Sequence, residues 1–394
     1  MQTTLSPPRF EHVDAVVASF IERGVIAGAV TLVARKGGIV HLSAQGHMDL
    51  ATGREMQTDT IFRLASMTKP VVSTAILVLL EEGRLVLTDP VSRFVPAFKA
   101  LHVETETGLV PASREVTLLD LLTHTAGLGT GPKPAMLTDV PGGVGTGLTL
   151  TDVVPRMASV PLRFQPGTQF RYSPELGFDV LGRVIEIASG QNLDKFLRSR
   201  ILEPLGATDL FFRVPADRLP DVATVYMRTP GGLRPVKPAG MLAFSTEGRG
   251  AAPLRPPYES GSGGLVGTAE AYARFALMLA QGGELDGYRV LTRRAVDLLA
   301  SNQVDELPLH TLYVDLTGYR FGLGVRVLDD PAAAGSLASR GTFGWSGAFN
   351  TEVWIDPVEH MVSLLLIQRM LDLEDAALHR LGPQIESAVY QALT

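Results

Sequence analysis

Two side chains that can support nucleophilic catalysis lie three residues apart near the start of an apolar segment. Ser66 and Lys69 belong to the tetrad Ser-Met-Thr-Lys, and no other serine among the 394 residues is followed by a lysine at this spacing. Residues three apart on a helix project from the same face, so the hydroxyl and the amine can touch. A serine hydroxyl is a weak nucleophile until a base removes its proton. A partly desolvated lysine has a lowered pKa and can serve as that base.

The apolar segment that follows predicts where this pair is placed. The mainly apolar run from Val71 to Leu80 ends in two glutamates and has only about half the length that crosses a bilayer, so it predicts a buried core helix. Pro70 is compatible with that helix only within its first turn, where backbone N–H groups lack partners anyway. We therefore expect Ser66 at the amino terminus of the helix, where the helix dipole favours developing negative charge.

The two ends of the chain show mirrored patterns that predict the fold class. Residues 10–20 have helical spacing and are followed by two β-rich runs within residues 28–46, around the turn Lys36-Gly37-Gly38. Residues 350–367 contain two more β-rich runs, and a helical pattern extends from there to residue 393. Sequential hairpins without alternating helices predict an α+β fold, in which terminal helices cover an antiparallel sheet.

The central part of the chain differs from both ends. Helical patterns at residues 116–123 and 178–187 alternate there with Gly- and Pro-rich loops. We predict that residues 1–87 and 260–394 form an α/β domain and that residues 88–259 form an inserted, mainly helical domain, with the active site in the cleft between them. The loops at residues 127–147 and 230–257 are either walls of a pocket or plain surface loops.

Composition narrows the classes of partner. The chain is 45% hydrophobic and 19% charged, as in globular proteins, and a net charge of -6 without a basic run argues against nucleic acid or an anionic membrane as partner. Cysteine is absent, and neither a His-x-x-x-His pair nor a P-loop is present, so we expect no metal and no cofactor. Residues 1–10 lack the features of a secretory signal, so we expect a cytoplasmic protein. The sequence does not indicate an oligomeric state.

Four ordered motifs carry a family resemblance. The run FRLASMTKP at residues 62–70 resembles the serine motif of class C β-lactamases and of their relatives, the family VIII carboxylesterases. The run LLTHTAGL at 121–128 resembles the loop that follows it, and Gln165-Pro166-Gly167 with Tyr172-Ser173-Pro174 resembles the tyrosine motif. After the glycine-rich residues 261–267, Gly344-Trp345-Ser346-Gly347 occupies the position of the Lys-Thr-Gly strand motif. The resemblance covers nearly the whole chain, and the carboxylesterase branch matches best.

The resemblance implies a serine β-lactamase-like fold and a set of site residues. It implies that Ser66 is the acylated nucleophile and that Lys69 and Tyr172 form the proton-transfer pair. It places the oxyanion hole at the backbone N–H groups of Ser66 and Ala348. It gives His124 a structural role in its loop, and it assigns contacts with a small-molecule substrate to Trp345, Ser346 and Gly347.

Two departures from the β-lactamase pattern bear on the substrate. Pro174 replaces an asparagine whose amide contacts the acylamino group of β-lactams, and proline cannot donate that hydrogen bond. Trp345 replaces the cationic residue that faces the β-lactam carboxylate, so we expect an apolar surface there. Both changes favour uncharged esters, and we predict a serine carboxylesterase for short- to medium-chain esters.

Several alternatives remain open. Within the same superfamily, the chain could be a β-lactamase, a D-amino-acid peptidase or an acyl transferase. A role in binding or scaffolding without catalysis is a further possibility. An α/β-hydrolase would need a Gly-x-Ser-x-Gly elbow followed by Asp and His, whereas the nearest run, GWSGA at 344–348, ends in alanine close to the carboxyl terminus.

Overall fold

An eight-stranded sheet joins the two ends of the chain in a computed structural model that describes residues 10–130, 148–236, 259–305, 307–310 and 316–393. All pairings between neighbouring strands are antiparallel, and β1 pairs with both β2 and β19. The sheet therefore combines strands from both ends of the sequence. In spatial order its strands are β15 (Tyr319–Phe321), β16 (Arg326–Leu328), β17 (Phe343–Ser346), β18 (Glu352–Asp356), β19 (Met361–Leu366), β1 (Gly28–Arg35), β2 (Gly38–Asp49) and β3 (Arg54–Glu55).

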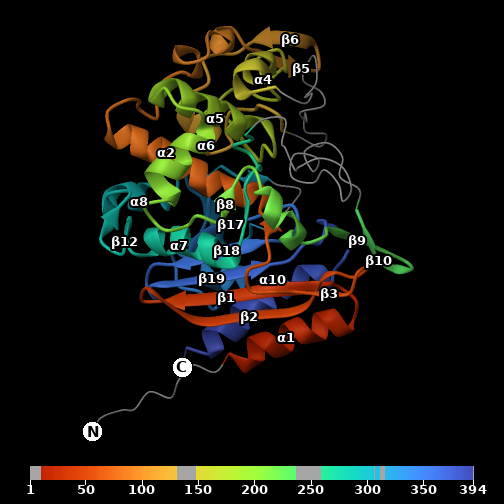
Figure 1. The fold of residues 1–394 in the computed structure, drawn as a ribbon. Coiled ribbons are helices and arrows are strands. Elements are labelled where there is room, and N and C mark those ends of the chain that lie inside the picture. The colour runs from red at the N-terminus through yellow and green to blue at the C-terminus, as the bar shows by residue number, and fades with distance from the viewer. Residues whose placement is uncertain (1–9, 131–147, 237–258, 306, 311–315, 394) are drawn as a thin grey trace.

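Helices cover both faces of this sheet (Figure 1). Side chains on a strand point alternately to opposite faces, and β1 is apolar on both. Its residues Val30 and Leu32 join the core on the side of α7 (Ala269–Ala280), whereas Ala29 and Val33 join a second core with α1 (Glu11–Glu22) and α10 (Leu381–Gln391). The predicted α+β fold, with terminal helices over an antiparallel sheet, is confirmed.

The helix that follows the Ser-Met-Thr-Lys tetrad is α2 (Thr68–Glu81), and its residues 68–79 are all buried. A helix that is apolar on every side must be enclosed, and α2 packs against both α5 (Leu176–Ser189) and α8 (Arg293–Leu299). Ser66 lies just before α2, in the 3₁₀ turn η1 (Ala65–Met67). The structure thus places Ser66 in a short turn that leads into the helix, two residues before the α-helix itself begins.

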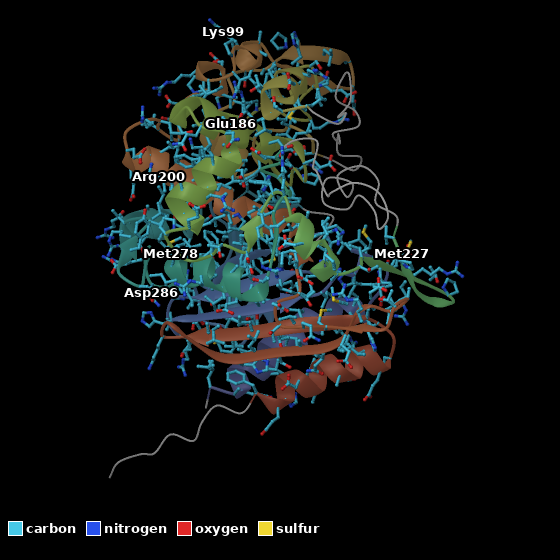
Figure 2. All side chains as sticks on the ribbon, viewed as in Figure 1. Lys99, Glu186, Arg200, Met227, Met278 and Asp286 are labelled. Atoms are coloured by element: carbon cyan, nitrogen blue, oxygen red, sulfur yellow. The ribbon has the colours of Figure 1, made fainter. Side chains whose placement is uncertain are left out.

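The described residues between α2 and α7 form short helices and hairpins beyond the sheet (Figure 1). Side chains fill the space between these elements and the sheet, and the partly exposed Met227 marks the projecting hairpin β9–β10 (Figure 2). The elements of this region are β5 (His102–Thr105), β6 (Gly108–Pro111), α3 (Leu118–Leu122), α4 (Leu150–Met157), β7 (Phe170–Arg171), α5, α6 (Leu193–Leu197), β8 (Leu210–Phe211), β9 (Tyr226–Thr229) and β10 (Gly232–Pro235).

The region also pairs with a strand that precedes α2 in the chain. Strand β8 and strand β4 (Phe62–Arg63) flank β11 (Val266–Gly267) in a three-stranded sheet. The expected domain boundaries at residues 88 and 259 stay a prediction. Of the two long loops considered above, residues 131–147 of the first and residues 237–257 of the second lie outside the described residues. Among the helices that are described, none is long and apolar enough to span a membrane.

Candidate active site

The Ser66 hydroxyl lies within hydrogen-bonding distance of two groups that can move protons. Its Oγ is 3.0 Å from Lys69 Nζ and 2.8 Å from Tyr172 OH. Ser66 is 6% exposed and Lys69 is fully buried. The lysine reaches the serine from one turn away, whereas the tyrosine is brought from 106 residues away along the chain. The structure thus gathers the three residues that the sequence singled out.

The surroundings of Lys69 favour a neutral amine. Its Nζ lies 2.9 Å from the Pro174 carbonyl oxygen and 2.7 Å from the Ser262 carbonyl oxygen. Burial lowers the pKa of Lys69 to about 7, although the carboxylates of Asp179 and Glu175 raise it. A neutral amine has two N–H bonds, which match the two carbonyls, and its lone pair can then accept the Ser66 proton. Near neutral pH the geometry therefore suits a general base.

The pKa of Tyr172 is shifted in the opposite direction from that of Lys69. Burial raises the pKa of its phenol to about 12, and hydrogen bonds with Ser66 and Trp345 oppose that rise. The Trp345 Nε1–H donates to the phenol oxygen over 3.2 Å. Trp345 is only 2% exposed, and its ring packs beside the tyrosine. A protonated phenol at this position can donate a hydrogen bond to Ser66.

His124 holds the segment that carries Tyr172. Its Nδ1 accepts the Ser173 backbone N–H at 3.2 Å, and its own carbonyl accepts the Arg171 N–H at 3.1 Å. The imidazole lies 4.6 Å from the Tyr172 ring. Burial, together with the charge of Lys69, lowers the pKa of His124 well below its usual range, so the ring stays neutral. These contacts fix both residues that flank Tyr172.

Asp179 is a buried acid on α5 that no motif in the sequence indicates. Its Oδ1 accepts the Ser260 hydroxyl at 2.7 Å and the Ser262 N–H at 2.8 Å. Asp179 thereby fixes the segment whose Ser262 carbonyl faces Lys69, and its charge moderates the loss of the lysine's proton. One signal was present in the sequence, because Asp179 stands between Phe178 and Val180, which are both buried in the same helix.

The end of β17 lies directly against the turn that carries Ser66. A Cβ at Gly347 would lie 2.4 Å from the Leu64 carbonyl oxygen, so only glycine permits this approach. The Gly347 N–H donates to the Thr351 carbonyl at 2.8 Å, and Ala348 follows directly. Ala65, before the nucleophile, has φ +47°, which is uncommon for a residue with a side chain. The two backbone segments expected to form an oxyanion hole are therefore neighbours.

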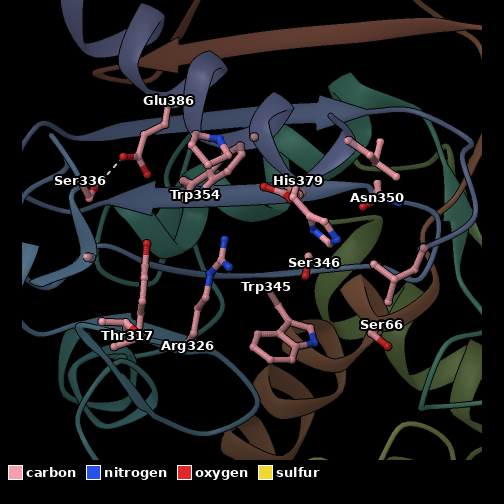
Figure 3. A pocket seen from close by; sticks show the side chains of 18 of the residues that line it. Ser66, Thr317, Arg326, Ser336, Trp345, Ser346, Asn350, Trp354, His379 and Glu386 are labelled. Carbon is pink, nitrogen blue, oxygen red and sulfur yellow. Dashed lines mark hydrogen bonds between the residues drawn. The ribbon is translucent and has the colours of Figure 1, made fainter. Parts of the chain in front are cut away.

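A cavity of about 530 Å³ opens beside Ser66 (Figure 3). It extends along the end of the sheet toward α10 and is closed in part by α9 (Pro331–Ala334). Apart from Lys69, which lies behind the nucleophile, the predicted site residues all line it: Ser66, Tyr172, Trp345, Ser346, Gly347 and Ala348. A ligand in the cavity would thus be within reach of the hydroxyl.

Comparisons with known proteins relate the whole chain to one family. The family model described as Beta-lactamase matches residues 13–382. Esterase EstB of Burkholderia gladioli is 34% identical over 375 residues, covering 90% of this chain and 89% of its own. Protein Rv1367c of Mycobacterium tuberculosis (strain ATCC 25618 / H37Rv) is 34% identical over 382 residues, covering 92% and 91%.

Solved structures show the same architecture. The chain is similar to EstCE1, titled a hydrolase with promiscuous acyltransferase activity, with a TM-score of 0.78, 27% identity and coverage of 96% of this chain and 98% of EstCE1. It also shares the fold of the simvastatin synthase LovD from Aspergillus terreus, with a TM-score of 0.79, 23% identity and 98% coverage of both chains. Both likenesses extend over nearly the full length.

Proposed function

We propose that this chain, which belongs to the Beta-lactamase family, is a serine carboxylesterase that works through an acyl-enzyme on Ser66. The resemblance seen in the sequence is confirmed by the family match and by the similarity to an esterase. The observation that carries the proposal is the position of Ser66 Oγ, 3.0 Å from a buried amine and 2.8 Å from a buried phenol, at the edge of a cavity.

In the proposed acylation step, Lys69 accepts the hydroxyl proton as Ser66 Oγ attacks the ester carbonyl carbon. The oxygen of the tetrahedral intermediate is stabilised by the N–H groups of Ser66 and Ala348, and a donor of this kind contributes about 3–4 kcal/mol. The ester C–O bond then breaks, and the alcohol leaves with a proton supplied through Tyr172. Water attacks the acyl-enzyme in the second step and releases the acid, which regenerates the serine hydroxyl.

The surroundings of Tyr172 support an uncharged ester as substrate. Where β-lactamases present a cation, this chain has Trp345, whose N–H donates to the catalytic phenol. Pro174 lines the cavity as well, and its carbonyl is already engaged by Lys69. Neither residue offers a charge to a substrate carboxylate, so we propose short- to medium-chain esters in preference to β-lactams.

Acyl transfer to an alcohol is a second candidate, since EstCE1 is described as having a promiscuous acyltransferase activity. Both reactions share the acyl-enzyme and differ only in whether water or an alcohol accepts the acyl group. Product analysis with a p-nitrophenyl ester and added alcohol separates them, because transfer yields a new ester and hydrolysis yields the acid.

The test is hydrolysis of p-nitrophenyl esters from acetate to octanoate, with nitrocefin as a β-lactam comparison. Ser66→Ala should abolish turnover and also the mass increase of the acyl-enzyme. Ser73→Ala is the matched control, because Ser73 is a buried serine on the adjoining helix α2 whose hydroxyl has no partner within the described residues. Equal turnover by wild type and Ser66→Ala would refute the proposal.

A further inference from the structure

The end of the cavity far from Ser66 is polar and charged. Figure 3 shows Ser66 at one end of the labelled residues and Glu386 with Ser336 at the other, with Arg326 and Trp345 between them. The acylation chemistry proposed above uses nothing beyond Trp345. The remote end therefore has features that ester cleavage by itself does not explain.

Strand register places two charged side chains of this end on one face of the sheet. Arg326 on β16 lies opposite Gly344, and Gly344 lies opposite Trp354 on β18. Glu352 is two residues before Trp354 and so shares its face. Trp354 packs in the core of α1 and α10, so this is the face that α10 covers.

Helix α10 closes over these groups at a glycine. A Cβ at Gly382 would lie 2.8 Å from a carboxylate oxygen of Glu352, so glycine leaves the space that the carboxylate occupies. On the next turn of the helix, Glu386 accepts the Ser336 hydroxyl at 2.6 Å. The remote end thus holds one guanidinium, the His379 imidazole and two carboxyl groups between the sheet and the helix.

Arg326 and Glu352 are close enough to interact and yet are not directly paired. Arg326 is 9% exposed, and in the described part of the chain its guanidinium has no hydrogen bond and no carboxylate within 4.0 Å. The guanidinium carbon lies 5.2 Å from the centroid of the Tyr319 ring. Burial raises the pKa of the Glu352 carboxyl and Glu386 adds to this rise, while Arg326 and His379 oppose it.

Unpaired polar groups in such a site have a large desolvation cost unless a ligand or water satisfies them. A guanidinium only donates hydrogen bonds, and an ionised carboxylate only accepts them. A group that satisfies both must offer an oxygen to Arg326 and an N–H or O–H to a glutamate. A carboxylate would face two glutamates, and an ammonium would face the arginine, so neither charged group fits both sides.

We propose that the remote end of the cavity binds an uncharged hydrogen-bonding group, a hydroxyl or a carboxamide, carried by the ester substrate away from the scissile bond. Arg326 donates a hydrogen bond to the oxygen of this group, and Glu352 accepts a hydrogen bond from its O–H or N–H. The inference rests on the proposed esterase function and adds a substrate class to it. Esters with a purely alkyl end leave both side chains unsatisfied and are poorer substrates.

The experiment compares p-nitrophenyl esters of equal length that end in methyl, hydroxyl, carboxamide, carboxylate or ammonium. A second series places the same five ends on the alcohol half, and shows which half of the substrate occupies the cavity. We expect the hydroxyl or carboxamide ends to raise kcat/KM about tenfold or more over methyl in one series, since a site built for hydrogen bonds rejects analogues that lack them. Equal or better turnover of the methyl end in both series, or preference for a charged end, would overturn the inference.

Variants test whether Arg326 and Glu352 cause the preference for a hydroxyl or carboxamide end. Arg326→Met and Gly382→Ala should each reduce the ratio of kcat/KM between the carboxamide and methyl ends, the first by removing the donor and the second by displacing Glu352. Arg320→Met is the matched control, because Arg320 is on neighbouring β15 outside the cavity lining and should leave the ratio unchanged. A ratio that survives both Arg326→Met and Gly382→Ala overturns the inference.

The esterase function and the hydrogen-bonding site at the remote end of the cavity can be refuted independently of each other. Methyl-ended esters that are cleaved by wild type and not by Ser66→Ala support the esterase whatever the ratio between ends. Absence of turnover of any ester by wild type refutes the esterase itself. Circular dichroism of each variant shows whether a lost activity reflects a lost fold.

Discussion

The pH dependence of kcat/KM for a neutral ester discriminates among the groups that could accept the Ser66 proton. Three buried titratable side chains cluster near the nucleophile: Lys69, Tyr172 and His124. Desolvation favours the neutral form of all three, so burial lowers the pKa of the amine and of the imidazole and raises the pKa of the phenol. The acid limb of the profile reports the pKa of the essential base in the free enzyme.

The expected change of kcat/KM with pH follows from the pKa of the buried Lys69 amine. The pKa of Lys69 is lowered from 10.5 to about 7, a preference for the neutral form of roughly 5 kcal/mol. With that pKa, about nine tenths of the enzyme carries a neutral amine at pH 8, and about one tenth does at pH 6. We therefore expect kcat/KM to rise about tenfold between pH 6 and pH 8 and then to level off.

The alternatives give different curves. If Tyr172, with a pKa of about 12, were the base, kcat/KM would continue to rise through pH 9. If His124 were the base, the limb would lie well below the usual histidine range, and the rate would be flat from pH 6 to pH 8. The assay follows p-nitrophenol release at the isosbestic wavelength of the phenol and phenolate, so that the titration of the product does not enter.

A variant tests the electrostatic origin of the limb. The Asp179 carboxylate raises the pKa of Lys69, so Asp179→Asn should shift the acid limb to lower pH while the amide oxygen can still accept the hydrogen bonds from Ser260 and Ser262. A limb that stays in place, or that moves to higher pH, refutes the reasoning about Lys69. A level profile in the wild type between pH 6 and pH 8 refutes it as well.

Three further substitutions probe the packing of the site. Trp345→Phe removes the donor to Tyr172, and the loss of a hydrogen bond of about 1 kcal/mol should lower kcat/KM roughly fivefold to tenfold. Unchanged ester kinetics would contradict that role. Gly347→Ala places a Cβ 2.4 Å from the Leu64 carbonyl, so displacement of the strand end should lower kcat about 100-fold or more, with the circular dichroism spectrum retained. Wild-type kcat would contradict the tight approach. Thr117→Ala removes the side-chain cap of α3 and should lower the free energy of unfolding by about 1 kcal/mol in urea titrations, with Thr117→Ser restoring it. Equal stability of the alanine and serine variants would contradict the cap.

The sequence by itself determined those features of the protein that depend on residues close together in the chain. Runs of β-forming residues around turns, together with helical spacing, predicted the strands and helices at both ends of the chain, and so the α+β fold. The contact between Ser66 and Lys69 was predictable for the same reason, since Lys69 is three positions after Ser66, where the chain enters α2. Tyr172 was identified only through its resemblance to a family motif, because its contact with Ser66 spans 106 residues.

The tertiary structure decided the properties that depend on several distant segments at once. The low pKa of Lys69 follows from complete burial beside the carbonyls of Pro174 and Ser262, which lie 105 and 193 residues further along the chain. The sequence predicted an apolar surface at Trp345, and only the fold shows that this residue lines the cavity, is almost fully buried and directs its N–H to Tyr172. The charged end of the cavity could not be read from any motif, because Arg326 and Glu352 share a face only through the register of three strands. Sequence spacing specifies neighbours within an element, whereas burial and electrostatic fields depend on which elements pack together.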